Sequence, residues 1–233
     1  SQLDRLEEEG LSRSAALNLR LFRQQLGWQV ESHRHKLDLF VMNQRDGLHT
    51  LATTADSIAF DQLDEFEQWV KRLETFGQYA DGEIETLREA IEADRVHPRI
   101  ITQRMIEAVA LQPNLHEVPE QSPFFAPFLQ KGSRFVGAPR YTELDRRAKT
   151  AITEQIGPAY RRLLTFLQGP YLAASHQKVG LSQLQGGMDA YRFLVGRYTT
   201  TELSPEDIHQ LGLTEVARIR REMEAVKAQV GYD

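Results

Sequence analysis

One short stretch combines residue types that could bind a catalytic metal. In His116-Glu117-Val118-Pro119-Glu120, a His is followed directly by a Glu, as in many zinc peptidases. Such an enzyme needs a second His four positions after the first, so that both rings reach the metal from one helical turn while the Glu acts as general base. Here the fourth position is Glu120, and Pro119 would interrupt the helix. We therefore interpret the stretch as a surface loop rather than a zinc site.

A second candidate for metal binding is the pair His33 and His35, with Asp38 nearby. Histidines two positions apart share one face of a strand and can chelate a metal there, whereas on a helix they point apart. Arg34 and Lys36 also place positive charge beside the site of a cation. An exposed polar turn is the favoured interpretation, and the alternative of a small metal-binding protein requires stoichiometric metal after purification.

Other classes of chemistry lack the residues that they need. The chain contains no Cys, which excludes thiolate nucleophiles, disulfides and Cys-ligated metals. It also contains no G-x-S-x-G nucleophile elbow, no P-loop and no dinucleotide-binding G-x-G-x-x-G. Runs of carboxylates such as Glu7, Glu8 and Glu9 are typical of solvated helix faces rather than of acid–base pairs. The residues alone therefore assemble no complete active site.

The densest group of functional residue types lies between Tyr191 and Thr201. Here Arg197 and Tyr198 end a predicted helix, and three threonines follow them. Such a helix end could present Arg197, Tyr198 and the threonine hydroxyls to a ligand carboxylate or a peptide backbone. In the alternative interpretation the tyrosines pack, and the threonines hold the turn through hydrogen bonds to local backbone groups.

Length and composition narrow the function classes further. The 233 residues carry 28 Lys and Arg against 33 Asp and Glu, so the net charge of −5 gives no basic footprint for nucleic acid or anionic lipid. No apolar run approaches the roughly 18 residues of a membrane span. The polar N-terminus is unlike a signal peptide. Because the chain begins at Ser1 within a predicted helix, we expect a piece of a longer protein.

Apolar residues recur at the helical period along most of the chain, which predicts an all-α fold, an irregular bundle of about eight helices. The first predicted helix ends near Gly27, and another ends at Gly77 before a separate helix from 84 to 91. The one hint of β-structure is a minor element near residues 37–42, where apolar residues alternate as they would in a strand: Leu37, Leu39 and Val41.

We expect one helical domain over residues 1–233 with three sub-regions. Residues 1–111 should form helical hairpins. Five prolines and two glycines make residues 112–140 an irregular connection with one short helix. Residues 141–233 should form long helices, the first of them kinked at Gly157-Pro158 because proline removes a backbone donor.

The last helix has the clearest signals. Ser204 is a good N-cap, and Pro205 suits the first helical position. An apolar stripe at spacings of three and four then predicts a seam that packs in a bundle: Val216, Ile219, Met223, Val226 and Val230.

The segment from Tyr191 to Ile219 resembles a signature of the bacterial domain of unknown function 885 (DUF885) family. The resemblance is carried by Tyr191-Arg192-Phe193-Leu194-Val195, by the run from Arg197 to Leu213, and by Glu215-Val216-Ala217-Arg218-Ile219. Further agreement is found at Ser122-Pro123-Phe124-Phe125-Ala126-Pro127-Phe128 and at Pro158-Ala159-Tyr160. It extends from near Leu37 to the C-terminus.

The resemblance implies a larger parent protein. Members of the family are largely helical, often exported or lipid-anchored, and similar in architecture to zincin-like metallopeptidases of the neurolysin and carboxypeptidase Taq kind. Their zinc motif, H-E-x-x-P-G-H, lies downstream of the segment that corresponds to Thr199–Glu206, and this chain contains no such motif. No catalytic or metal-binding residue is therefore carried over. We expect this chain to hold no cofactor and to be inactive alone, with zinc implied for the parent.

The expected function is thus that of a non-catalytic helical portion, which forms one wall of a substrate cleft in a zinc-dependent peptidase. The expected partners are the carboxy-terminal catalytic portion and a peptide substrate, and the resemblance implies a periplasmic or lipid-anchored location. Residue type and the resemblance suggest four substrate contacts: Arg197, Tyr198, Thr199 and His209. The rival interpretation is a free-standing helical module that binds a partner peptide in a groove. Exposed apolar surface on an isolated portion also predicts a homodimer.

Overall fold

The computed structural model describes residues 10–231. Glu7, Glu8, Glu9 and the predicted helix at Ser1 lie outside this range. The described residues form helices, turns and a single isolated bridge between Pro98 and His176, with no strand among them. The prediction of an all-α fold is therefore confirmed. The chain divides into two compact units, residues 1–35 with 181–233 (unit 1) and residues 36–180 (unit 2). Whether the two form one domain, as we expect from the sequence, stays a prediction.

Unit 1 contains α1 (Arg13–Arg34), α9 (Gly187–Thr199) and α10 (Pro205–Val230). Helix α1 runs through Gly27 instead of ending there, so the predicted end was wrong. A glycine costs a helix only about 1 kcal/mol, and the apolar stripe continues on both sides of it. The ring of His35 at the end of α1 stacks on Phe193 of α9, with the ring centroids 5.4 Å apart. No described residue of α1 or α10 is buried.

Unit 2 is built around α2 (Leu63–Glu92), a single helix of 30 residues. The prediction that Gly77 ends this helix was wrong. A Cβ at Gly77 would lie 2.7 Å from Oε1 of Gln155, so the glycine leaves room for this side chain of the neighbouring π-helical turn. Leu37 and Leu39 form one 3₁₀ turn rather than the predicted β element near residues 37–42. Lys36 takes a left-handed conformation (φ 55°) that turns the chain before an extended pairing can start.

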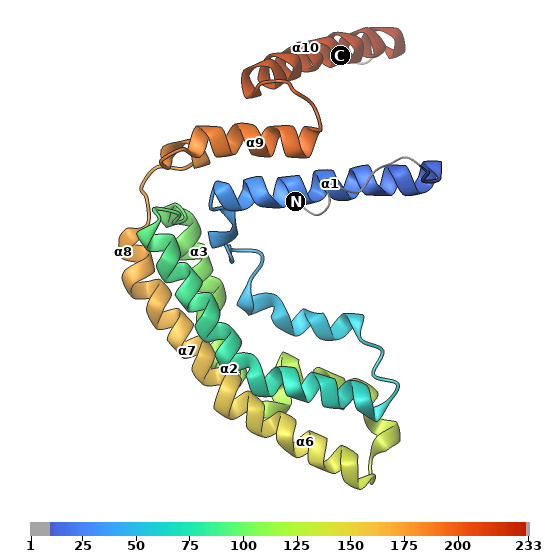
Figure 1. Cartoon of the computed structure of the whole chain (residues 1–233), viewed down its shortest axis with the longest axis vertical. Coiled ribbons are helices and arrows are strands. Elements are labelled where there is room, and N and C mark those ends of the chain that lie inside the picture. Colours follow the sequence, from blue (N-terminus) through green and yellow to red (C-terminus); the bar gives the residue numbers. More distant parts are fainter. Residues whose placement is uncertain (1–9, 232–233) are drawn as a thin grey trace. The chain divides into compact units, whose positions relative to one another are not determined.

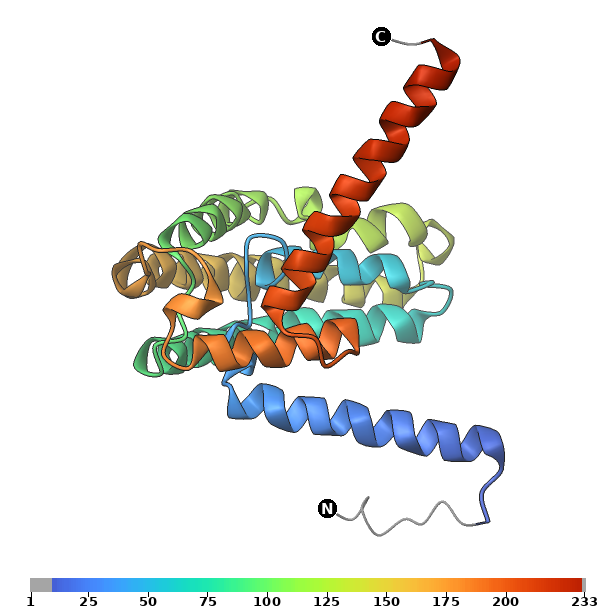
Figure 2. The same ribbon diagram turned by 90° about the horizontal axis from the view of Figure 1, so that it is seen from above.

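Helix α6 (Pro139–Ala151) continues through a π-helical turn (Ile152–Ile156) into α7 (Gly157–Phe166). The turn lies directly before Pro158, at the position where the sequence predicts a kink. Its wider hydrogen-bonding pattern lets the helix continue past a proline that has no N–H to donate. Helices α6 and α7 lie beside α2 and run in the same direction, as both views show (Figures 1 and 2).

Ion pairs link α2 to these two helices. Arg147 donates two hydrogen bonds of 2.8 Å to the carboxylate of Glu74, and Arg162 donates one of 2.8 Å to Asp81. Arg140 forms a similar pair with Asp64. Because these groups are partly or largely exposed to solvent, the pairs contribute little to stability, and the main stabilisation comes from the apolar core beneath them.

The remaining elements of unit 2 close the two ends of the core. They are α3 (Arg99–Ala110), α4 (Gln112–Leu115), α5 (Ala126–Lys131), α8 (Leu172–Ala174), a π-helical turn (Leu167–Tyr171), and the 3₁₀ segments η3 (Leu48–Ser57), η4 (Pro119–Gln121), η5 (Pro123–Phe125) and η6 (Ser133–Phe135). Helix α5 is the short helix predicted within the proline-rich connection. Buried aromatic rings of the connection pack against α2 and complete the core: Phe124, Phe125 and Phe128.

Candidate functional site

The joint between α9 and α10 contains the residues that the sequence singles out for ligand contact. Helix α9 ends where Thr200 takes a left-handed conformation (φ 55°). The Thr199 hydroxyl donates to the Val195 carbonyl at 2.8 Å and lies 2.9 Å from the Thr201 hydroxyl, while the Thr200 hydroxyl donates to the Thr199 carbonyl at 2.7 Å. The threonine hydroxyls therefore hold the turn. A ligand at this joint would compete with these local bonds.

Ser204 fixes the start of α10, as the sequence predicts. Its hydroxyl oxygen accepts from the Asp207 N–H at 3.0 Å, and an Asp207 carboxylate oxygen accepts from the Ser204 N–H at 3.1 Å. This capping box satisfies two backbone donors at the helix end. The Ser204 hydroxyl also donates to the Asp207 carboxylate, and this bond together with the one from the Ser204 N–H holds the pKa of Asp207 below its usual range. The joint is therefore a defined turn between two helices, not a loose linker.

Arg197 and Tyr198 extend from the last turn of α9. The Arg197 guanidinium lies 5.9 Å from the centre of the Tyr198 ring, and 79% of Tyr198 is exposed. Arg197 has no carboxylate partner among the described residues. His209 is exposed on the second turn of α10. These side chains are thus free to meet a partner, although no described cavity encloses them.

His116 lies in the core of unit 2, so the interpretation of the stretch as a surface loop was wrong for this residue. Its ring stacks on Tyr160, with centroids 5.2 Å apart, and its Nδ1 lies 2.8 Å from the Ser122 hydroxyl. Prolines on both sides of Ser122 fold the connection back over the ring. Burial lowers the pKa of His116 to about 4, so the ring is neutral near pH 7. Glu117 is exposed and does not join it.

His33 and His35 lie at the C-terminal end of α1. On a helix, residues two apart point in different directions, and His35 is engaged with the Phe193 ring. Within residues 10–231, no three His, Cys, Asp or Glu side chains gather as they would around a metal ion. None of the described helices combines the length and the apolar character that crossing a membrane requires.

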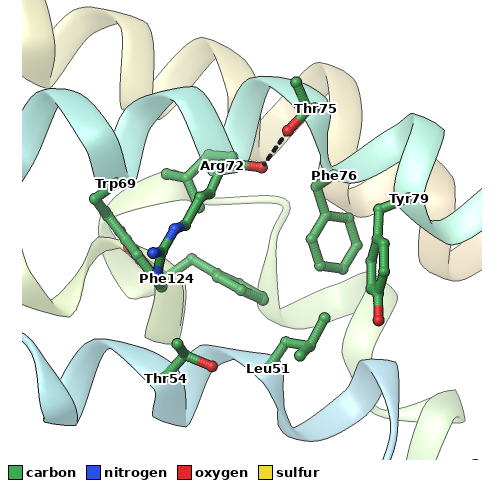
Figure 3. A pocket seen from close by; sticks show the side chains of 9 residues that line it. Leu51, Thr54, Trp69, Arg72, Thr75, Phe76, Tyr79 and Phe124 are labelled. Carbon is green, nitrogen blue, oxygen red and sulfur yellow. Dashed lines mark hydrogen bonds between the residues drawn. The ribbon is translucent and has the colours of Figure 1, made fainter. Parts of the chain in front are cut away.

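The structure adds a cavity that the sequence analysis missed. It has a volume of about 290 Å³ and lies in unit 2 between η3 and α2 (Figure 3). Its lining combines aromatic rings with one guanidinium: Leu51, Thr54, Trp69, Arg72, Leu73, Thr75, Phe76, Tyr79 and Phe124. Trp69, Arg72, Phe76 and Tyr79 follow one another at spacings of three and four along one face of α2. That spacing is also the signal of a buried helix face, so the sequence alone does not distinguish a pocket from core.

Comparison with known proteins gives a family and a fold. A search of curated proteins finds no match. The fold is similar to the crystal structure of "the putative lipoprotein from Colwellia psychrerythraea", with a TM-score of 0.71 and 22% sequence identity. The match covers 83% of this chain and 33% of that one, so this chain spans about a third of the length of the protein it matches. The model of the family described as "Bacterial protein of unknown function (DUF885)" matches residues 1–233, and the chain belongs to that family.

Proposed function

We propose that this chain is a non-catalytic helical portion of a larger, zinc-dependent peptidase and forms one wall of its substrate cleft. The observation that carries the proposal is the apolar stripe of α10, which no described residue covers. Its exposed fractions range from 45% to 68%. The stripe consists of Val216, Ile219, Met223, Val226 and Val230. Such a continuous apolar surface on a soluble helix is typical of an interface.

The share of the matched structure supports a larger assembly. This chain aligns with only 33% of the Colwellia psychrerythraea protein, which leaves two thirds of that protein without a counterpart here. We infer that the corresponding part of the parent protein packs against the α10 stripe. The architectural similarity of the family to zincin-like metallopeptidases supports the assignment of that part as the catalytic portion, with zinc bound there and not by this chain.

The joint between α9 and α10 is the proposed point of contact with a peptide substrate. Arg197 offers a planar set of donors for a carboxylate, and Tyr198 offers a large exposed ring beside it. Thr199 would have to exchange its bond to the Val195 carbonyl for one to substrate, so Arg197, Tyr198 and His209 are the stronger contacts. The matched protein is described as a lipoprotein, which supports a lipid-anchored location outside the cytoplasm for the parent.

The test uses the full-length protein that carries this segment, with a mixed peptide library and with or without a chelator. We expect chelator-sensitive cleavage. The variant Arg197→Ala should lower kcat/KM by about tenfold, the loss of one charge-assisted hydrogen bond. Arg220→Ala, on the exposed surface of α10, is the matched control and should leave turnover unchanged. Full activity of Arg197→Ala would contradict the role of the joint, and a full-length protein that binds no metal would favour the free-standing binding module.

A further inference from the structure

The cavity between η3 and α2 has rigid aromatic walls. The indole N–H of Trp69 donates to the Phe124 carbonyl at 2.9 Å, which fixes the ring and satisfies its one donor within the protein. The Phe76 ring meets Phe124 edge to face, with centroids 5.4 Å apart. The opposite wall is formed by Leu51 and Thr54 of η3, and outside the lining Tyr160 donates to the Leu48 carbonyl at 2.6 Å and so anchors the start of η3. The walls are thus held by buried contacts before any ligand arrives.

Arg72 is the one charged residue that lines the cavity. Figure 3 shows its side chain extending from α2 toward η3, beside Trp69, with Tyr79 at the other end of the space. Its neighbours three and four positions away are uncharged: Gln68, Trp69, Thr75 and Phe76. No described carboxylate pairs with Arg72.

Other arginines of unit 2 pair with carboxylates of α2. Arg147 of α6 is paired with Glu74, and Arg162 of α7 is paired with Asp81. Those acidic residues lie on a different face of α2 from Arg72, and the guanidinium of Arg72 is the one charged group in the lining of the cavity. The lining contains no carboxylate that would compete with an anion for Arg72, and Glu83, which interacts with Tyr79, lies outside it.

The size of the cavity limits its ligand. A cavity of about 150 Å³ accommodates benzene, so about 290 Å³ accommodates one aromatic ring with a short chain or a fused pair of rings. Binding pockets for small molecules combine mostly apolar walls with a few polar groups that fix orientation. Here the apolar part consists of the rings, and the polar part is the guanidinium.

We propose that the cavity binds a small aromatic carboxylate, with its ring against Trp69, Phe76 and Phe124 and its carboxylate on the guanidinium of Arg72. The planar guanidinium matches a carboxylate through two parallel hydrogen bonds, which an alcohol or an amine of the same shape lacks. The site is separate from the α9–α10 joint in sequence and belongs to unit 2 alone.

Trp69 supplies the readout. The chain contains two tryptophans, so a Trp28→Phe background leaves Trp69 as the only one, and its fluorescence reports on the cavity. The probes are 3-phenylpropionate, 3-phenylpropanol and 3-phenylpropylamine, which share a ring and a chain but differ in charge. We expect a saturable change with the acid, about fivefold weaker binding of the alcohol, and still weaker binding of the amine.

Two variants and one control complete the test. Arg72→Gln should weaken binding of the acid about fivefold and abolish its advantage over the alcohol. Thr54→Phe should fill the mouth of the cavity and prevent binding of both. Arg104→Gln removes another exposed arginine of unit 2, one that does not line the cavity. This variant should bind the acid as tightly as the Trp28→Phe chain does. Equal affinity for acid and alcohol, full binding by Arg72→Gln, or no saturable signal with the acid would each overturn the proposal.

Discussion

Because α2 is continuous, the effect of a substitution at Gly82 on the free energy of unfolding can be predicted. This residue lies in the interior of the helix, is exposed, and has open space where a Cβ would be placed. Alanine is favoured over glycine inside a helix by about 0.5–1 kcal/mol, chiefly because glycine loses more backbone entropy on folding. Gly82→Ala should therefore raise the free energy of unfolding by about this amount.

Two other glycines provide controls for this prediction. At Gly77 the new Cβ would approach Oε1 of Gln155 to 2.7 Å, so that side chain must move and the gain should be smaller. Gly137 has φ +93°, a region that alanine adopts only with strain, so Gly137→Ala should destabilise by about 1 kcal/mol.

The assay is urea unfolding, followed by helical circular dichroism and by Trp69 fluorescence in the Trp28→Phe background, so that the signal of unit 2 is identified. The midpoint for Gly82→Ala should rise without a change in the slope of the transition. A neutral or destabilising effect would refute the continuous helix, since it would place Gly82 in a turn between two shorter helices.

Three further predictions concern the core, the response to pH and the exposed stripe. Tyr160→Phe leaves the Leu48 carbonyl without its hydrogen bond and should cost about 1–3 kcal/mol in urea unfolding; an unchanged midpoint would argue against that bond. The pKa of His116 is lowered to about 4 from 6.5, so the unfolded chain takes up a proton first and stability should fall between about pH 6.5 and 4, by up to roughly 3 kcal/mol. In His116→Phe the loss of stability over this pH range should be smaller. An equal dependence of stability on pH in the two proteins would contradict a buried neutral ring. The isolated chain should self-associate through α10, and the double variant Ile219→Glu, Met223→Glu should be a monomer by light scattering. A monomer already in the unsubstituted chain would count against the interface.

Much of the fold could be predicted because local signals determine it. The Ser204 cap and Pro205 mark the start of α10, and periodic apolar residues mark the helices around them. The predicted helix ends at Gly27 and Gly77 were wrong because a glycine can either end a helix or lie within one. The sequence predicts a helix end at Gly77. In the structure this glycine leaves room for the side chain of Gln155, a residue distant along the chain.

Some features of the candidate sites could likewise be predicted from the sequence, and others could not. The α9–α10 joint was predictable from residue types, and the local bonding of its threonines was one of the alternatives considered. The position of His116 was not predictable, since its burial depends on Tyr160 and on the fold of the proline-rich connection. The cavity at Arg72 also escaped prediction, because the absence of an ion-pair partner is visible only once the other helices are in place.

We propose that this chain forms the helical wall of a metal-dependent peptidase. The most direct test is peptide cleavage by the purified full-length protein, measured together with its metal content before and after chelation. We expect about one bound zinc per chain, held outside these 233 residues, and cleavage that stops on chelation and returns with zinc. A metal-free full-length protein that cleaves no peptide would contradict it.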